Sequence, residues 1–295
     1  FIYIVEDFML SIDKEKIVEQ LIYLGINKGD TVLIRASLGK IGRINGGARV
    51  VVEALLEAVG PEGTIISLAF TSGAKFFKMP SKEDAFDISK KSYAGALPNT
   101  MISHELSHRS RHPMCSYVAI GRHAEFLTAD HDETSPAYEP IRKLINLNGK
   151  CLLIGCVKDS PGFTTTHLAE FDLGLLKLNI FPKMNRVFYR GGSGELNLFR
   201  RSDPGLCSNS YYKFYSHYVR EGILFTGKIG NAYSVIADAS SAYKIDKQLL
   251  IKNKKFNICE NKDCFTCNGG RWDRVHYLPF YLLRRILFFL INRLR

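Results

Sequence analysis

The spacing of apolar residues in the first third of the chain predicts alternating helices and strands. Apolar side chains recur three and four positions apart from Ile17 to Leu24, which predicts a helix that Ser11 can cap. Short apolar runs bounded by turn residues are typical of buried strands. Further along this region we expect a strand at residues 31–34, a helix at 46–59 and a strand at 64–70.

The same alternation continues through the second half of the chain. The apolar run at 151–155 predicts a strand, and the threonines at 164–166 predict a helix start. We also expect a helix at 211–219 and a strand at 229–239, whereas the polar, lysine-rich segment 72–93 indicates a loop or lid. The whole pattern predicts an α/β fold: a three-layer αβα arrangement around a mixed sheet, with a lid-like insertion and a C-terminal helical extension.

The last part of the chain differs from the rest in charge. Of the formal net charge of +11, residues 251–295 carry +7 and residues 1–250 only +4. Residues 277–295 are apolar and aromatic with interspersed arginines, which predicts a helix. Such a helix can lie in a membrane interface or pack against a core or a second copy of the chain. We therefore expect a domain boundary near residue 250, with a basic, cysteine-containing extension after it.

Several classes of protein are excluded by what the sequence lacks. No known nucleic-acid-binding motif accompanies the basic residues, so nucleic acid is not an expected partner. No apolar run reaches 18 residues, and the first ten residues lack the basic start of a signal peptide, so we expect a cytoplasmic protein, with peripheral attachment to the inner membrane face left open. Residues 222–228 have the glycine and lysine spacing of a phosphate loop, but Ile229 replaces the required Ser or Thr.

The most informative chemistry follows the strand at 151–155. His167 and Glu170 are three positions apart near a predicted helix start, so an imidazole and a carboxylate can face one cavity. The positive end of the helix dipole disfavours a charged ring, which would leave His167 able to accept a proton. A His-x-x-Glu pair is also common on helix surfaces and in caps. The pair alone therefore does not establish a general base.

Seven short segments together resemble one known family. In order and spacing they are similar to the aminoglycoside 3-N-acetyltransferase family, which also includes acyltransferases that act on other amino sugars. The resemblance covers about residues 18–240. The segments are RASLGKIG at 35–42, GGARVVVEALLEAVG at 46–60, PEGTIISLAF at 61–70, AGALP at 94–98, RSRHPMCSY at 109–117, SP at 135–136 and TTTHLAE at 164–170.

The resemblance implies an acetyl-CoA-dependent N-acetyltransferase that works by direct transfer in a ternary complex. It implies that His167 takes a proton from the amine, that Glu170 orients the ring and that the Thr165 hydroxyl donates to the thioester oxygen. Phosphates of the coenzyme need amide groups and a helix start. The residues expected at the coenzyme are Ser37, Leu38, Gly46, Gly47 and Ala48, together with Arg109 and Ser110 of a loop that lines the cleft.

The acceptor is the least determined part of this hypothesis. Aminoglycosides are polycations, whereas this chain is basic, so we favour an amino sugar on a nucleotide or another phosphate-bearing carrier of surface polysaccharide synthesis. Aminoglycosides, with antibiotic resistance as the outcome, are the alternative. Arg35 and Phe163 stand where the family usually has His and Asn, which keeps a non-catalytic coenzyme- or sugar-binding protein as a further alternative. The oligomeric state, including a homodimer, stays open.

The histidines and cysteines also allow metal hypotheses. Cys259, Cys264 and Cys267, followed by His276, could close a tetrahedral zinc site, but the first spacing is wide and unpaired thiols are the favoured interpretation. Three further histidines, at 104, 108 and 112, recur every four residues, a spacing that on one helix could present a metal site. Pro113 argues against one helix there, so we assign His112 to the cleft-lining loop and predict no catalytic metal.

Overall fold

The computed structural model describes residues 11–74, 78–176, 179, 181, 183–203, 205 and 207–293. Its centre is a seven-stranded sheet with strand order β3-β4-β2-β1-β5-β9-β8. The strands are β1 (Thr31–Ala36), β2 (Thr64–Leu68), β3 (His108–Arg109), β4 (Tyr117–Gly121), β5 (Lys150–Ile154), β8 (Phe225–Ile229) and β9 (Ala232–Asp238). The three central strands β2, β1 and β5 run parallel, and the outer pairs are antiparallel. The predicted mixed sheet is confirmed.

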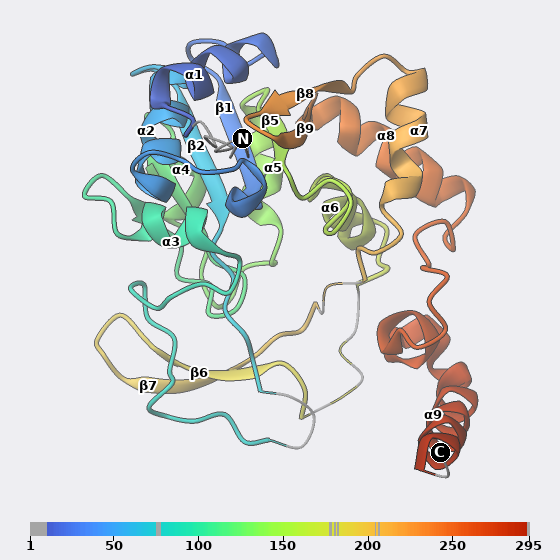
Figure 1. The fold of residues 1–295 in the computed structure, drawn as a ribbon. Helices are drawn as coiled ribbons and strands as arrows, with labels where there is room; N and C mark the ends of the chain where they lie inside the picture. Colours follow the sequence, from blue (N-terminus) through green and yellow to red (C-terminus); the bar gives the residue numbers. More distant parts are fainter. Residues whose placement is uncertain are drawn as a thin grey trace, which may run out of the picture.

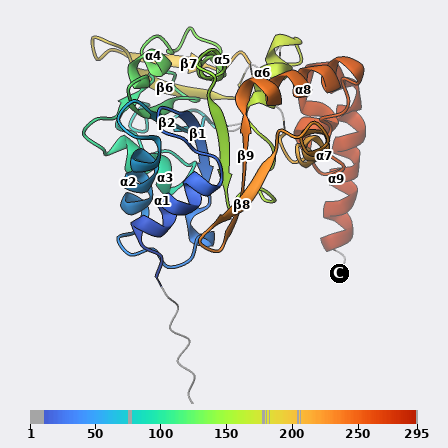
Figure 2. The same ribbon diagram turned by 90° about the horizontal axis from the view of Figure 1, so that it is seen from above.

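Helices cover both faces of this sheet, as the α/β pattern predicts (Figures 1 and 2). One face carries α1 (Lys14–Tyr23), α2 (Gly47–Val59) and α3 (Ala96–Ile102), and the short turn η1 (Leu38–Lys40) follows β1. The other face carries α4 (Ala124–Thr128), α5 (Glu139–Asn146), α6 (Thr165–Asp172) and α8 (Ala239–Lys252), and α7 (Tyr212–Arg220) packs against α8.

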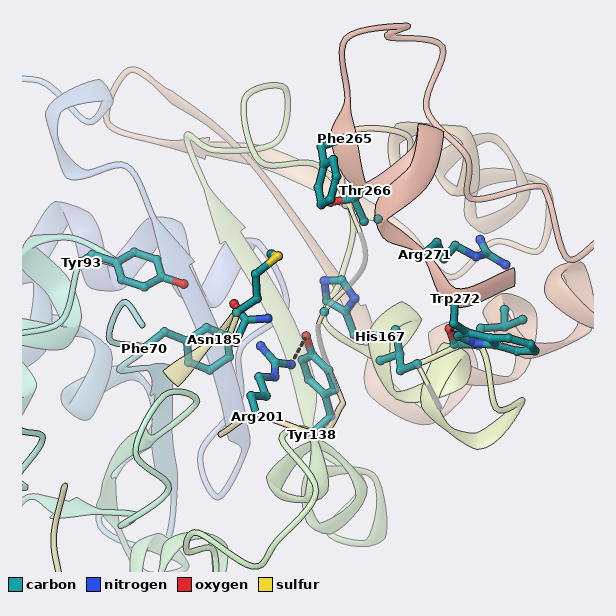
Figure 3. A pocket seen from close by; sticks show the side chains of 15 residues that line it. Phe70, Tyr93, Tyr138, His167, Asn185, Arg201, Phe265, Thr266, Arg271 and Trp272 are labelled. Atoms are coloured by element: carbon teal, nitrogen blue, oxygen red, sulfur yellow. Dashed lines mark hydrogen bonds between the residues drawn. The ribbon is translucent and has the colours of Figure 1, made fainter. Parts of the chain in front are cut away.

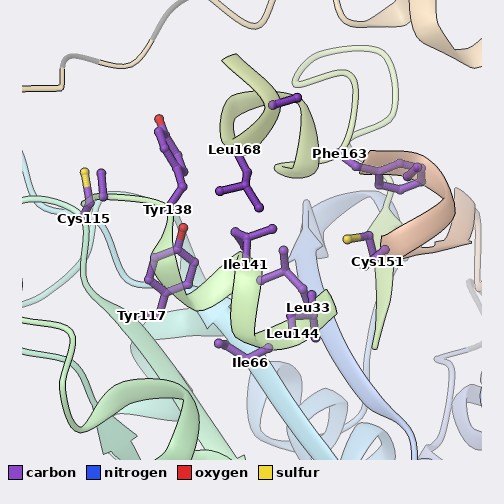
Figure 4. Packing of buried hydrophobic residues seen from close by; sticks show 14 of the residues in the cluster. Leu33, Ile66, Cys115, Tyr117, Tyr138, Ile141, Leu144, Cys151, Phe163 and Leu168 are labelled. Carbon is purple, nitrogen blue, oxygen red and sulfur yellow. The ribbon is translucent and has the colours of Figure 1, made fainter. Parts of the chain in front are cut away.

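Two apolar cores hold these layers together. On the α5 and α6 face, Leu33 of β1 and Ile66 of β2 meet Ile141, Leu144 and Leu168, all of them at most 1% exposed (Figure 4). On the opposite face, α2 buries one side made of residues three and four positions apart, Val51, Val52, Ala54, Leu55, Ala58 and Val59, which is the amphipathic pattern of the sequence. The helix–sheet frame therefore fixes where the strand ends lie, and with them the loops that carry polar side chains.

Two elements differ from the sequence prediction. The first helix is capped by Asp13, whose side chain accepts a hydrogen bond from the Lys16 amide, so the prediction of Ser11 as the cap is wrong. The segment around 186–200 forms an antiparallel hairpin of β6 (Arg186–Arg190) and β7 (Leu196–Arg200), where no strand was predicted from the sequence. The described part of segment 72–93 pairs with this hairpin at Ala74 and at Phe86, so the expected lid is a loop fixed to β6.

Residues 253–293, the C-terminal extension, follow α8. They contain η2 (Thr266–Gly270), η3 (Trp272–Tyr277) and the last helix, α9 (Leu278–Arg293), which points away from the sheet (Figure 1). The predicted helix at 277–295 is thus present as far as the structure describes it, and residues 294–295 lie outside the described residues. Among the described helices, none combines the length and the apolar character needed to span a bilayer.

Candidate active site

His167 lies at the point where two cavities meet. The first has a volume of about 330 Å³ and the second about 430 Å³, and His167, Phe70 and Tyr93 line both. In Figure 3 the imidazole stands between Tyr138 and Arg201 on one side and Arg271 and Trp272 of the C-terminal extension on the other. Its side chain is 16% exposed, so the ring is accessible but mostly enclosed.

The orientation of the His167 ring is set by three contacts. Nδ1 lies 2.9 Å from the Glu170 Oε2 and 2.8 Å from the Tyr211 hydroxyl. The ring also stacks on Tyr138, with centroids 4.9 Å apart and planes 16° apart. Because both polar partners are at Nδ1, Nε2 is the nitrogen left without a hydrogen-bond partner among the described residues. With the proton on Nδ1 donated to Glu170, the Nε2 lone pair is available to the cavities.

Glu170 is a buried carboxylate with its own support. It is 0% exposed, and its other oxygen accepts a hydrogen bond from the side-chain amide of Asn257 in the C-terminal extension. Asn257 is in turn fixed, because its carbonyl accepts from the Ser210 hydroxyl and its side-chain oxygen from Arg271 at 3.2 Å. Burial, reinforced by the negative charge of Glu170, raises the pKa of the Tyr211 hydroxyl well above its ordinary value. Tyr211 therefore stays neutral. With the ring proton on Nδ1, the Tyr211 oxygen is an acceptor towards the ring, and its hydroxyl donates to Glu170.

The structure brings His167 and Glu170 together but places Thr165 elsewhere. The Thr165 hydroxyl donates to Asp246 of α8 at 2.7 Å in a fully buried setting, and Thr165 lines neither cavity. Burial raises the pKa of the Asp246 carboxyl to about 7. The neighbouring Thr164 does line the second cavity, and its buried hydroxyl has no partner among the described residues. Thr164, and not the expected Thr165, is therefore the threonine of the cluster that faces the cavity, because the phase of the helix decides which hydroxyl points there.

Arg109, Ser110 and His112 hold loops in place and line neither cavity. The Arg109 guanidinium donates to the carbonyls of Ile88, Lys90 and Ala69. Ser110 accepts from the Tyr117 amide, and His112 accepts from the amides of Met114 and Cys115. The polar groups of this segment therefore have partners within the protein, and its expected contact with the coenzyme stays a prediction.

The N-terminal residues expected at the coenzyme divide into two groups. Ser37 and Leu38 are half-buried at the end of β1, and the Ser37 amide already donates to Ile154. Gly46 and Gly47 adopt φ of 87° and 65° before α2, and a Cβ on Gly46 would lie 2.5 Å from Val50. That backbone needs glycine and leaves the helix start exposed. Neither cavity is lined by Ser37, Leu38, Gly46, Gly47 or Ala48.

Arg35 shows what replaces the usual family histidine. Its guanidinium donates to the carbonyls of Gly162 and Ser160, both at 2.8 Å, and it lines the second cavity. Phe163, the other departure, is 1% exposed and packs on Tyr215 and Tyr218. Both residues therefore stabilise the loop that leads into α6, and through it the position of His167.

Several residues of this site could not be found from the sequence pattern. Tyr211 and Asn257 contact the His167–Glu170 pair from positions 41 and 87 residues downstream of Glu170, and no local spacing connects them. Cys207 is a further case, because it joins Cys259, Cys264 and Cys267 in one cluster. His276, the expected fourth ligand, is outside that cluster and lies against Tyr277.

Comparisons with known proteins agree on one family. Residues 33–251 match the family model for aminoglycoside 3-N-acetyltransferase. A relative from Bacillus subtilis (strain 168), the SPbeta prophage-derived aminoglycoside N(3')-acetyltransferase-like protein YokD, is 32% identical over 59% of this chain and 71% of its own length. The aminoglycoside N(3)-acetyltransferase III of a Salmonella species is 31% identical over 53% of this chain, and the match spans 59% of that enzyme.

A solved structure extends this likeness to three dimensions. AAC-IIIb in a binary complex with CoASH superimposes with a TM-score of 0.69 at 26% identity, covering 82% of this chain and 97% of that one.

Proposed function

The chain belongs to the aminoglycoside 3-N-acetyltransferase family, and on that basis we propose that it transfers an acetyl group from acetyl-CoA to an amine of an aminoglycoside. One observation carries the proposal: the His167–Glu170 pair stands where two cavities meet. A direct transfer needs two substrates bound at once, with a proton acceptor between them. The two cavities, each large enough for part of a substrate, supply that arrangement.

In the proposed reaction His167 acts as the general base. The amine nitrogen attacks the thioester carbon, a C–N bond forms, and Nε2 takes the proton that the nitrogen loses. The tetrahedral intermediate then collapses by breaking the C–S bond. The leaving thiolate receives the proton from the imidazolium, which returns His167 to its starting state and releases free CoA thiol.

Glu170 and Tyr211 would serve as positioning residues in this scheme. Glu170 accepts from Nδ1 and so favours the ring tautomer whose Nε2 is unprotonated. When Nε2 gains a proton, the same carboxylate stabilises the charged ring at a distance of 2.9 Å. Tyr211 fixes the ring from a second direction without bringing a charge of its own.

The developing negative charge on the thioester oxygen needs a donor, and we propose the Thr164 hydroxyl in place of Thr165. Thr164 is 3% exposed, lines the second cavity and has no other partner among the described residues, whereas Thr165 is committed to Asp246. A buried hydroxyl without a partner is costly, so a ligand oxygen that completes its hydrogen bond would be favoured.

We propose that acetyl-CoA enters through the second cavity. Arg35 brings a positive charge there, and the exposed glycines 46 and 47 open a 13-residue helix whose amides and dipole suit a phosphate. The CoA-bound relative supports the choice of coenzyme. Ser37, Leu38 and Ala48 stay part of the proposed phosphate region, next to the cavity rather than in its wall.

The acceptor would then occupy the first cavity. The relatives favour the aminoglycoside alternative of the sequence analysis over the carrier-linked sugar that we preferred there. A second candidate is an amino sugar on a phosphate-bearing carrier, because Arg201 and Arg271 line the cavity and no carboxylate is among its described lining residues. Each guanidinium also pairs with an aspartate, Arg201 with Asp203 at 3.1 Å and Arg271 with Asp273 at 2.6 Å, so the wall offers a phosphate hydrogen-bond donors rather than two unpaired positive charges.

The test is thiol release from acetyl-CoA with two acceptors, gentamicin and a nucleotide-linked amino sugar. We expect release above the hydrolysis rate with the aminoglycoside and a product heavier by one acetyl group. Faster turnover with the nucleotide-linked sugar would identify that sugar, and not the aminoglycoside, as the acceptor. If neither amine raises the rate above hydrolysis, the proposed activity is contradicted and the non-catalytic alternative takes its place.

The C-terminal extension has a proposed role of its own in this scheme. We propose that the catalytic domain ends near residue 250, and that the later residues close the acceptor cavity. Exposed apolar side chains along α9, such as Phe280 at 71%, support peripheral membrane contact or packing on a second copy of the chain. Sedimentation with anionic liposomes, comparing the full chain with one truncated before Tyr277, distinguishes membrane contact from packing on a second copy. If α9 contacts the membrane, the full chain sediments with the liposomes and the truncated chain stays in the supernatant.

A further inference from the structure

Four cysteines from two distant parts of the chain meet next to the acceptor cavity. They are Cys207, which precedes α7, and Cys259, Cys264 and Cys267 of the C-terminal extension. Their sulfur atoms all lie within 4.8 Å of one another, and none forms a disulfide. Two of the four residues are buried and two half-buried, so the cluster is sheltered but reachable by an ion.

The spacing of the sulfurs fits one tetrahedral metal ion. Zinc binds thiolates at about 2.3 Å, and a tetrahedron of that size has sulfurs about 3.8 Å apart. An iron–sulfur cluster places several atoms between its cysteines and would hold the sulfurs farther apart. Four sulfur ligands in a tetrahedron favour zinc over harder cations such as magnesium or calcium.

The backbone around the cluster also suits thiolate ligands. Cys264 and Cys267 have the two-residue separation that is common in structural zinc sites. The Cys259 amide donates to the Cys267 sulfur at 3.5 Å, and the Asn268 side chain ties the loop by donating to the carbonyls of Asn261 and Cys264. Amide donors to sulfur stabilise negative charge on the ligand. A four-thiolate zinc site carries two net negative charges, which the net charge of +7 in residues 251–295 balances.

Metal binding at this place would fasten the cavity wall to the catalytic domain. Cys207 lies three residues before Ser210, which donates to the Asn257 carbonyl, and Asn257 lies two residues before Cys259. Asn257 also holds Glu170, and residues 265, 266 and 270–272 line the cavity beside His167. A metal ion bound by the four cysteines would therefore fix Glu170, through Asn257, and also the cavity wall.

We propose that Cys207, Cys259, Cys264 and Cys267 bind one structural Zn²⁺ ion that holds the C-terminal extension against the active site. The thiols lose their protons on binding, and the ion takes no part in the transfer reaction. The proposal extends the proposed function but does not depend on it, because the metal content of the protein is independent of any activity.

The test is the metal content of the full chain, purified without a metal-binding tag and measured by mass spectrometry of the elements. We expect about one zinc per chain. The double variant Cys264→Ser/Cys267→Ser should fall below about a tenth of that content. Cys151→Ala, which removes a buried thiol outside the cluster, is the matched control and should keep its zinc.

A second measurement decides the case if the double variant does not fold. The full wild-type chain, unfolded, stripped of metal and refolded with Co²⁺, should show the sulfur-to-cobalt charge-transfer bands and the intense visible bands of tetrahedral thiolate coordination. Wild-type protein with less than about a tenth of a zinc per chain and no such bands would overturn the proposal. So would equimolar iron in place of zinc, or disulfides among the four cysteines found by peptide mass spectrometry.

Discussion

Residues 11–250 bury two large apolar clusters, one on each face of the sheet, whereas the described C-terminal extension buries almost no aliphatic side chain. The buried residues of the extension are Asn257, Cys259, Cys267, Gly269 and Arg271. Burial of apolar area stabilises the first region, since each fully buried aliphatic side chain contributes about 1.5–3 kcal/mol. The second region depends on hydrogen bonds, ion pairs and the cysteine cluster.

This difference separates two tasks of the proposed enzyme. In the proposed scheme the catalytic domain holds the base, because α6 packs against α5 and α8 and carries both His167 and Glu170. The extension shapes the acceptor cavity and reaches back to Glu170 through Asn257. Changes in the first region should therefore alter the chemical step, and changes in the second should alter acceptor binding and local stability.

The largest effect is expected at Glu170. Glu170→Gln keeps the shape of the side chain but can donate to Nδ1, which favours the wrong ring tautomer. We expect kcat to fall about 10²- to 10⁴-fold with little change in the KM for acetyl-CoA. Steady-state thiol release measures both. A rate within threefold of the wild type would show that the carboxylate does not orient the base.

The next effect tests the link between the two regions. Asn257→Ala leaves a Glu170 oxygen without this partner and removes one of the hydrogen bonds of Arg271, so we expect the free energy of unfolding to fall by about 1–3 kcal/mol. Asn253→Ala is the control, because Asn253 is exposed and contacts neither residue. Urea unfolding followed by tryptophan fluorescence reports on the extension, whose Trp272 is the single tryptophan. Equal midpoints for the two variants would contradict the link.

A smaller effect is expected in the cavity wall. Trp272 lines the acceptor cavity, and its indole donates to the Leu175 carbonyl at 3.2 Å. Trp272→Ala should raise the KM for the acceptor on the order of tenfold, which corresponds to about 1.4 kcal/mol, with kcat and the KM for acetyl-CoA nearly unchanged. Tyr277→Ala changes an aromatic residue outside the cavity and should leave all three constants alone. A fall in kcat alone would place Trp272 in the chemical step.

The two regions should also respond to pH in opposite directions. Burial raises the folded-state pKa of Asp246 to about 7, above its ordinary value of 3.8. The native state then holds a proton that the unfolded state releases. The resulting stability is fully present below about pH 4 and is lost as pH rises through 7, on the order of 1 kcal/mol per pH unit. The cysteine cluster should instead bind zinc more tightly as pH rises, because thiols must lose protons.

Asp246→Asn isolates the part of this pH dependence that belongs to the catalytic domain. The variant cannot ionise, so its unfolding free energy should change less between pH 5 and pH 7 than that of the wild type. Circular dichroism in urea at several pH values measures this difference. An unchanged slope would mean that Asp246 is already ionised in the native state at pH 5.

Local elements of the catalytic domain can be predicted from the sequence, whereas contacts between distant segments cannot. The helix at 46–59 follows from its apolar spacing, because α2 buries one face. The strand at 151–155 follows from its continuous apolar run, because β5 is buried on both faces. His167 and Glu170 share one helix turn, so local spacing also predicts their contact. Thr164 and Thr165 could not be told apart, since the choice depends on the exact phase of α6 against Asp246. The contacts of Tyr211, Asn257 and Cys207 join distant segments, which only the folded chain brings together.

The most direct test of the central claim is the turnover of His167→Ala, measured as thiol release with saturating acetyl-CoA and acceptor. The account predicts a fall of about a hundredfold or more, while calorimetry shows acetyl-CoA bound as tightly as by the wild type. Full turnover by this variant with the coenzyme bound would contradict the account, since the amine would then lose its proton without the imidazole.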